Sequence, residues 1–280
     1  MNPDQYCQQK AAASGSSFYY AFRLLPTEKR AAITAFYAFC REVDDVVDEV
    51  TEPNVARTKL AFWRQEIEAL FAGAPKHPVT KAIERHIAPM QLPASAFHTV
   101  IDGMQQDLEK NRYLNIDELR GYCYRAAGVV GEVSARIFGM RTMNDPRTLE
   151  YARLLGESLQ LINIIRDVGE DARRGRIYLP SDELTRFGVA TSDLLHAKSS
   201  PEFVSLMQFQ HDRAASTYKA ALAALPAEDK SAQKSGLAMA AIYRTLLEEI
   251  RRDGFRVLEH RVALTPIRKL WIACKTAAFA

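Results

Sequence analysis

Two pairs of aspartates constrain the folding of this 280-residue chain more than any other feature. Asp44 and Asp48 form one pair, Asp167 and Asp171 form the other, and each pair lies in an apolar segment with helical spacing. A separation of four residues places both carboxylates on one face of a helix, one turn apart. Because like charges at that spacing repel, we expect a cation between them, and a divalent ion that prefers carboxylate and phosphate oxygens is the natural candidate. Two such faces directed at one cavity would form a site for a diphosphate and its magnesium ions.

Apolar residues recur at steps of three and four along most of the chain, which predicts an all-α fold. Helices are expected at 27–50, 53–71, 79–88, 94–111, 116–139, 146–172, 201–224 and 231–259. Glycine and proline residues mark the breaks between these segments. The sequence has no alternating strand pattern, internal repeat or low-complexity linker. Residues 1–280 are therefore predicted to form a single all-α domain.

Each aspartate pair continues as a polar stripe along its helix. The first stripe comprises Tyr37, Arg41, Asp44 and Asp48, and the second comprises Gly156, Gln160, Asn163, Asp167 and Asp171. The residues between members of the second stripe are nearly all apolar, which is typical of a buried helix. Its polar stripe must face a cavity or polar partners, because isolated buried charge is costly. A single pair is equally compatible with an exposed face neutralised by arginines, but two pairs favour a functional site.

Other side chains suit the same chemistry. Gln160 and Asn163 can bind phosphate oxygens, and Arg41 and Arg176 can pair with phosphate through their guanidinium forks, with an ordinary salt bridge as the alternative. Small residues at 126–135 predict close helix packing, a widened lumen for a long apolar ligand, or both on different faces. Aromatic side chains that can line this lumen and stabilise a carbocation, or serve as ordinary core, are Phe18, Tyr19, Phe22, Phe36, Tyr37 and Tyr243.

Composition narrows the class of protein. The chain carries 37 basic and 34 acidic residues, for a net charge of +3, which argues against a nucleic-acid partner. Basic residues gather between Arg251 and Lys275, where a solvated face is the favoured interpretation and contact with a membrane surface is the alternative. No dinucleotide, P-loop, zinc-hydrolase, di-iron or serine-hydrolase motif occurs.

The sequence also indicates where the protein works. It shows neither a signal-peptide pattern nor a run of ~18–20 apolar residues that would span a bilayer. Its four cysteines have no CxxC spacing and are expected to be reduced. The expected location is the cytoplasm, with peripheral contact to the inner face of the membrane as the alternative.

Five segments of this sequence resemble the squalene/phytoene synthases, the head-to-head prenyl diphosphate synthases. They are SGSSFYYAFRLLP, YAFCREVDDVVD, YCYRAAGVVGE, LGESLQLINIIRDVGEDARRGRIYLP and IYRTLLEEI, and they span nearly the whole chain. The opening YCQQKAAASGSSFYY is further similar to the bacterial presqualene diphosphate synthases of the squalene and hopanoid route.

This resemblance implies an isoprenoid-synthase-type helical domain with a central cavity, and it implies roles for individual residues. Those implied to bind Mg²⁺ and diphosphate are Asp44, Asp45, Asp48, Asp167 and Asp171, with Gln160 and Asn163 beside the second cluster. Those implied to contact diphosphate are Arg41, Arg176, Tyr178 and Arg261, while Tyr37 and Tyr243 would line the reacting centre. Ser16, Ser17 and Phe18 match the N-terminal substrate-flap motif, although the histidine or arginine that some members carry there is missing.

The activity expected from the resemblance is Mg²⁺-dependent condensation of two farnesyl diphosphates to presqualene diphosphate, followed by hand-over to a downstream squalene-forming enzyme. Synthesis of phytoene, dehydrosqualene or, with NADPH, squalene is the alternative. A terpene cyclase is disfavoured because DVGED does not fit the mixed second metal motif of that class. A non-catalytic assembly factor would be expected to lose the aspartates, and this chain keeps them all.

Overall fold

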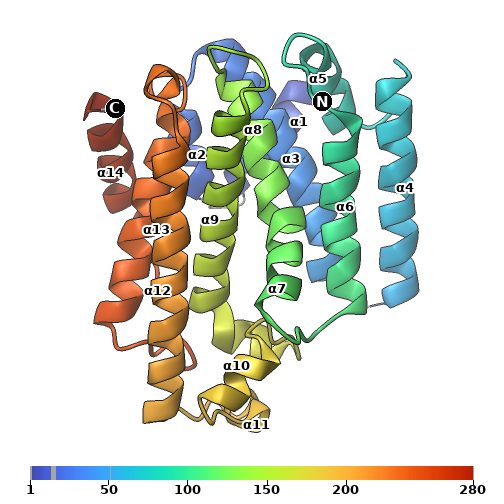
Figure 1. Ribbon diagram of the computed structural model, residues 1–280. Coiled ribbons are helices and arrows are strands. Elements are labelled where there is room, and N and C mark those ends of the chain that lie inside the picture. The colour runs from blue at the N-terminus through green and yellow to red at the C-terminus, as the bar shows by residue number, and fades with distance from the viewer. Residues whose placement is uncertain (1, 14–16, 51, 280) are drawn as a thin grey trace.

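Long helices that run up and down beside one another form most of the protein (Figure 1). The computed structural model describes residues 2–13, 17–50 and 52–279, and within these ranges it contains helices and no strand. The α-helices are α1 (Pro3–Ala13), α2 (Ser17–Phe22), α3 (Thr27–Glu49), α4 (Pro53–Phe71), α5 (Pro78–Ile87), α6 (Ala94–Glu109), α7 (Ile116–Cys123), α8 (Val129–Phe138), α9 (Pro146–Arg173), α10 (Ser181–Arg186), α11 (Thr191–Leu195), α12 (Pro201–Ala224), α13 (Lys234–Arg252) and α14 (Pro266–Phe279). The all-α prediction is confirmed.

Helix α9 lies in the middle of the bundle and packs against α8, α12 and α13 (Figure 1). Its position follows from its sequence, because apolar residues on almost every side require a buried environment. Pro146 occupies the first turn, and the side chain of Asp145 accepts a hydrogen bond from the amide of Arg147. At the other end Gly175 adopts a φ of +76°, which turns the chain back towards the bundle.

The structure departs from the predicted helices at two places. The segment 116–139 is interrupted at Tyr124–Gly128 by a π-helical turn, in which the amide of Val129 donates to the carbonyl of Tyr124 five residues back. The helix predicted to reach residue 259 ends at Arg252, because Gly254 and Phe255 both take positive φ angles that a right-handed helix cannot contain.

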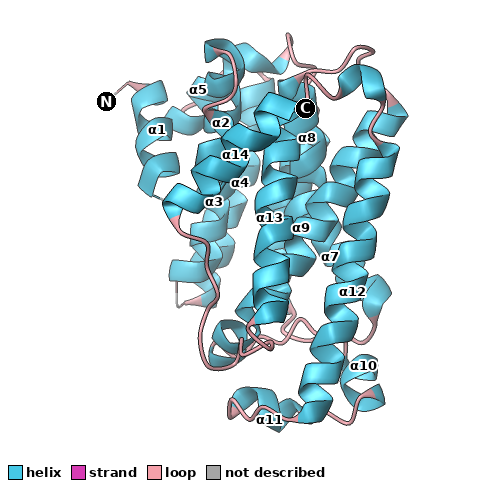
Figure 2. Ribbon diagram, turned by 90° about the vertical axis from the view of Figure 1, so that its left-hand side faces the viewer, coloured by secondary structure: helices cyan, strands magenta, loops and turns pink. Residues whose placement is uncertain are grey.

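Five helices lie outside the predicted segments. They are α1 and α2 near the start of the chain, the short α10 and α11 at the lower end of the bundle, and α14 (Figure 1). Viewed from the side, α14 lies over the upper part of α13, and the loop that precedes it climbs along the bundle (Figure 2). None of the helices in the described ranges is long and apolar enough to cross a membrane.

The buried apolar residues fall into two clusters. One cluster is built largely from α9, α12 and α13, and the other largely from α3, α4, α5 and α6. Phe18 and Ala126 pack against both clusters, so they mark the boundary between them. The cavity of the protein is lined from both sides of this boundary, for example by Phe36 of one cluster and Leu155 of the other.

Candidate active site

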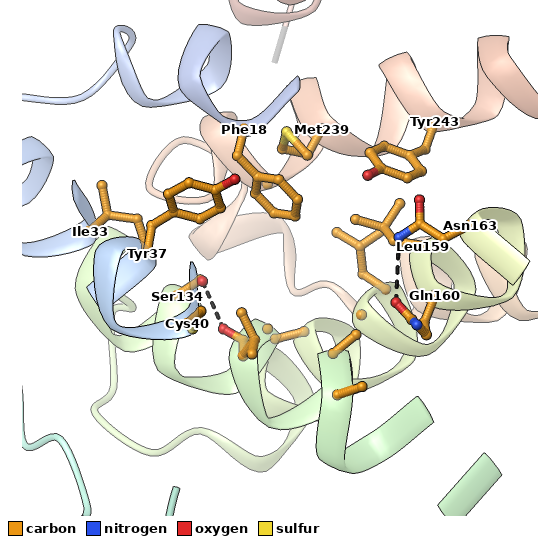
Figure 3. A pocket seen from close by; sticks show the side chains of 18 of the residues that line it. Phe18, Ile33, Tyr37, Cys40, Ser134, Leu159, Gln160, Asn163, Met239 and Tyr243 are labelled. Atoms are coloured by element: carbon orange, nitrogen blue, oxygen red, sulfur yellow. Dashed lines mark hydrogen bonds between the residues drawn. The ribbon is translucent and has the colours of Figure 1, made fainter. Parts of the chain in front are cut away.

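A cavity of about 400 Å³ lies between α2, α3, α8, α9 and α13 (Figure 3). This volume is within the usual range for a small-molecule site. Along α3 the lining residues change from Ile33 and Phe36 to Arg41 and Asp44. Along α9 they change in the same order, and the last of them are Gln160, Asn163 and Arg166. The cavity is therefore apolar at one end and polar at the other.

The first aspartate face, on α3, is held by basic side chains. The guanidinium of Arg41 donates to Asp44 at 2.5 Å and also to Asp45. Lys10 of α1 places its Nζ atom 2.7 Å from Oδ2 of Asp45. Burial raises the pKa of Asp44 to about 7, because Arg41 only partly offsets the burial and the charges of nearby aspartates, including Asp48. Asp44 therefore gives up its proton less readily than an exposed aspartate does.

The second aspartate face, on α9, contains two carboxylates in different environments. Asp167 accepts hydrogen bonds from the adjacent Arg166 and from Arg261, the latter at 2.7 Å. Burial alone would raise the pKa of Asp167, but these two arginines hold it below its usual value. Burial, together with the charge of Asp167, raises the pKa of Asp171 to about 7. The second face therefore also contains a carboxylate that lacks a sufficient positive partner.

The two aspartate faces lie around the polar end of the cavity, where Asp44 lines the wall together with Arg166 and Arg261, the two arginines paired with Asp167. Arg176, beyond the end of α9, donates from Nη1 to Oδ1 of Asp48 at 3.2 Å and from Nη2 to the carbonyl of Val47 at 3.2 Å. The turn at Gly175 directs Arg176 back towards α3. Residues 128 positions apart are thereby joined, and the segment that follows the second face contacts the first face.

A half-buried carboxylate that the sequence analysis missed lies near both faces. Asp107 of α6 accepts hydrogen bonds from the hydroxyls of Tyr122 and Tyr178, each at 2.8 Å. Burial raises the pKa of Asp107 to about 6, and its charge contributes to the raised pKa of both Asp44 and Asp171. A sequence signal was present, because Asp107 continues the buried positions Val100, Gly103 and Met104 at helical spacing.

Aromatic rings surround the polar end and the middle of the cavity. Phe18 stacks on Tyr37 with 5.6 Å between ring centroids and lies 6.4 Å from the ring of Tyr243 (Figure 3). Phe22 meets Tyr37 edge to face at 5.7 Å. Phe36 also lines the cavity. These five rings were candidates from the sequence, and their faces can interact with a cation inside the cavity.

Not every predicted site residue lies on the cavity wall. The residues that line it are Phe18, Tyr37, Arg41, Asp44, Gln160, Asn163, Tyr243 and Arg261. Those that lie away from the wall, in the surrounding ion pairs and hydrogen bonds or beside a smaller pocket, are Asp45, Asp48, Asp167, Asp171, Arg176 and Tyr178. Ser16 and the side chains of Ser17 and Tyr19 lie outside the described residues. Arg166 and Lys269 line the cavity and were not predicted.

The small residues of α8 and the π-helical turn serve both purposes considered from the sequence. A Cβ atom on Gly131 would lie 2.2 Å from the carbonyl oxygen of Ala152, and one on Gly156 would lie 2.3 Å from that of Ala127. Glycine is therefore required where this segment packs against α9. Ala126 and Ser134 border the cavity, so small side chains also leave space there.

The donor set fits a divalent ion that is shared with a phosphate ligand. No three His, Cys, Asp or Glu side chains in the described ranges come together as a chelating group. Arginines pair with Asp44, Asp48 and Asp167. Among the described residues, the buried Oδ1 of Asn163 has no hydrogen-bond partner. Mg²⁺ is commonly held by one or two carboxylates plus substrate phosphates. The protein oxygens at the polar end suit that mode of binding.

Comparison with known proteins identifies the family. The family model for squalene/phytoene synthase matches residues 11–268. The chain belongs to the squalene/phytoene synthase family. Enzymes of this family are prenyltransferases that join prenyl diphosphates head to head with the help of divalent metal ions. The resemblance inferred from the sequence motifs is thus confirmed.

Individual members of the family align along most of the chain. A phytoene synthase from Arthrospira platensis is 36% identical and aligns over 95% of this chain and 89% of its own length. A 15-cis-phytoene synthase from Synechococcus elongatus is 37% identical, over 94% of this chain and 89% of its own. A dehydrosqualene synthase crystallised with a ligand superposes with a TM-score of 0.90 at 28% identity, covering 99% of this chain and 96% of its own. The squalene synthase HpnC from Alicyclobacillus acidocaldarius superposes with a TM-score of 0.81 at 26% identity. The superposition covers 90% of this chain and 94% of that one. The fold is that of these isoprenoid synthases.

Proposed function

We propose that this enzyme condenses two molecules of farnesyl diphosphate head to head to presqualene diphosphate and releases one diphosphate. The observation that carries this proposal is the position of the two aspartate faces around the polar end of an otherwise apolar cavity, where Asp44 and the Arg261 that pairs with Asp167 line the wall. The polar end suits a diphosphate with its cations, and the apolar end suits a prenyl chain. The opening residues 6–20, which are similar to presqualene diphosphate synthases, support this product.

Mg²⁺ is the cation we propose, and Asp44, Asp45, Asp48, Asp167 and Asp171 are the residues that would hold it. Bound there with diphosphate, it would supply the positive charge that stabilises a departing diphosphate. Arg41, Arg176, Tyr178 and Arg261 would contact phosphate oxygens, together with the amides of Gln160 and Asn163. Ser16 and Ser17 would contribute to a flap over the substrate.

The condensation breaks the bond between C1 and oxygen in one farnesyl diphosphate, and the bonding electrons leave with the diphosphate. The double bond of the second molecule attacks the resulting allylic cation, and loss of one proton closes a cyclopropane ring. Phe18, Tyr37 and Tyr243 surround the space in which that cation would form, and their π faces would stabilise it. The departing diphosphate and a tyrosine are the two candidates for the proton acceptor.

Phytoene formation from two 20-carbon diphosphates is a second candidate function. It is favoured by the names of the sequence relatives, since the chains at 36% and 37% identity are both phytoene synthases. Both functions use the same condensation and differ in the length of the prenyl chain.

Incubation with farnesyl or geranylgeranyl diphosphate and Mg²⁺, with and without NADPH, tests the proposal. We expect presqualene diphosphate from farnesyl diphosphate, and we expect that NADPH changes neither rate nor product. Preference for the 20-carbon substrate with a 40-carbon product would establish the second candidate instead. Squalene formed by this protein alone with NADPH would identify a complete squalene synthase, and no condensation product from either substrate would overturn both candidates.

We also propose that residues 1–280 act as one domain, because the site draws on helices from α2 to α14. The proposed location is the cytoplasm beside the inner face of the membrane. Presqualene diphosphate has a charged head and a long apolar tail, so it would pass to a downstream squalene-forming enzyme rather than diffuse freely in water.

A further inference from the structure

The outward face of α14 is apolar. Ile267, Leu270 and Trp271 are 82%, 41% and 61% exposed, and the exposed Cys274 continues the same stripe. These positions recur at the three- and four-residue spacing of one helix face. The opposite face carries Ile272 and Ala273, which are buried in the core. The helix therefore has one apolar side that packs on the protein and a second that meets solvent.

Lys275 borders this exposed stripe. Helix α14 also carries Arg268, which pairs with Glu249 of α13 at 2.7 Å, and Lys269, which lines the cavity. No Asp or Glu occurs in residues 260–280. The ammonium of Lys275 lies 5.0 Å from the centre of the Trp271 ring. Exposed tryptophan and leucine beside lysine and arginine are typical of a helix that lies in the plane of a membrane interface.

The exposed stripe lies beside the wall of the cavity. Lys269, on the same turn as Trp271, lines the cavity, and so does Arg261 from the loop before α14. Helix α14 also packs against α2, which contributes Phe18 and Phe22 to the cavity wall. A long prenyl chain with a charged head could move between this helix face and the cavity over a short path.

The charge of this face distinguishes between its two possible partners, a second copy of the chain and a lipid membrane. In a two-fold contact with a second copy of the chain, the same surface would face itself and bring like cations together. An anionic bilayer would instead pair those cations with lipid phosphates while covering the apolar side chains. The stripe thus complements a lipid surface better than it complements itself.

We propose that α14 is a membrane-docking helix that rests on an anionic bilayer, with Ile267, Leu270 and Trp271 inserted among the headgroups. The proposal that this surface docks on a membrane does not depend on which reaction the enzyme catalyses. Its use for loading prenyl diphosphates or releasing product rests on the proposed function.

Binding of the full chain to phosphatidylcholine vesicles, with and without one quarter phosphatidylglycerol, tests the docking surface in the absence of any substrate. We expect sedimentation with the anionic vesicles, weakened by 0.5 M salt, and a blue shift of tryptophan emission. Trp271 would report this shift, because Trp63 is 4% exposed and already buried. The triple variant Ile267→Ser, Leu270→Ser, Trp271→Ser should bind at least tenfold more weakly.

Two exposed apolar residues elsewhere provide a matched control. Val55 and Phe62 of α4 are 47% and 46% exposed, and changing both to Ser should leave vesicle binding unchanged. The triple variant should keep the melting temperature of the wild type, which separates loss of docking from loss of the fold. Equal vesicle binding by the triple variant, or no binding by the wild type, would overturn the proposal. A wild-type dimer that the triple variant converts to monomer would show that the face binds a second copy instead.

Discussion

Arg176 donates a hydrogen bond to Asp48 across 3.2 Å and so joins the end of α9 to the end of α3. Arg176 lies five residues after Asp171, the last member of the second aspartate pair, and Asp48 belongs to the first pair. The guanidinium supplies part of the positive charge that the first face needs. A diphosphate with its cations would compete for the same groups, because its oxygens suit a guanidinium fork.

Arg176→Gln should therefore lower kcat/KM by about 10- to 100-fold, the range expected for losing one hydrogen-bonded charge. Release of diphosphate measures the effect. Arg174 provides the control, because it lies 3.6 Å from the same carboxylate but its side chain is 59% exposed. Arg174→Gln should stay within about twofold of wild type, and equal losses in the two variants would contradict a specific role for Arg176.

The hydrogen bond from Tyr178 to the half-buried Asp107 yields a prediction about both stability and turnover. Tyr178→Phe removes one of two donors to Asp107 and should lower the free energy of unfolding by about 1–3 kcal/mol, with a fall in turnover. Tyr113 stacks on Tyr178 at 5.7 Å but does not bond Asp107. Tyr113→Phe should therefore retain turnover. Chemical denaturation and product formation measure the two quantities, and turnover unaffected in Tyr178→Phe would leave Asp107 a purely structural group.

Glu66 should make stability depend on pH. This buried carboxylate accepts hydrogen bonds at 2.6 Å from the amides of Lys76 and His77 and from the hydroxyl of Thr80. Burial acts to raise its pKa, but these hydrogen bonds outweigh burial and lower the pKa below its usual value. The folded state then binds the proton less readily than the unfolded state. The resulting stabilisation is present above the unfolded pKa and is lost as the pH falls through the folded one.

Denaturation at a series of pH values from 7 to 3 tests this linkage. Wild type should lose more unfolding free energy over that range than Glu66→Gln, which has no carboxylate to protonate. Glu68→Gln, two residues along α4 and exposed, should follow the wild-type curve. Parallel curves for wild type and Glu66→Gln would show that the hydrogen bonds do not lower the pKa of Glu66 in the folded protein.

Close packing and cavity volume can be separated by two substitutions on α8. Gly131→Ala should lower the free energy of unfolding by about 1–3 kcal/mol, because the new Cβ would lie 2.2 Å from the carbonyl of Ala152. Ser134 borders the cavity, and its hydroxyl donates to the carbonyl of Val130 in its own helix. Ser134→Leu should keep a melting temperature near that of wild type and shorten the prenyl chain accepted. Unchanged chain-length preference in Ser134→Leu would exclude a role for this wall in substrate selection.

Local spacing predicted the features of the site that lie along one helix. The i, i+4 pairs and their polar stripes need only helical geometry, so the positions of Asp44, Gln160 and Asn163 followed from the sequence. The hydrogen bond between Tyr178 and Asp107 spans 71 residues, and the pairing of Arg176 with Asp48 spans 128. Such contacts depend on how α3 and α6 are placed relative to the loop after α9, which no short pattern encodes.

The segment after residue 252 shows a second limit of predicting structure from hydrophobic periodicity. A helix was expected to continue to residue 259, but positive φ angles at Gly254 and Phe255 end it. The apolar residues of α14 have the spacing of an ordinary packed helix, although Ile267 and Trp271 face solvent. Hydrophobic spacing identifies one face of a helix without indicating whether protein, lipid or water covers it.

Substitution of one aspartate on each face tests most directly whether the two faces form one cation–diphosphate site. Diphosphate release is measured for Asp48→Asn and for Asp171→Asn at saturating Mg²⁺, with Asp102→Asn, an exposed aspartate of α6, as control. Each of the first two variants should fold normally and lose at least ~100-fold in turnover, as expected when transition-state stabilisation by a bound cation is removed. The control should match wild type. Near-normal turnover in either Asp48→Asn or Asp171→Asn would contradict a shared site.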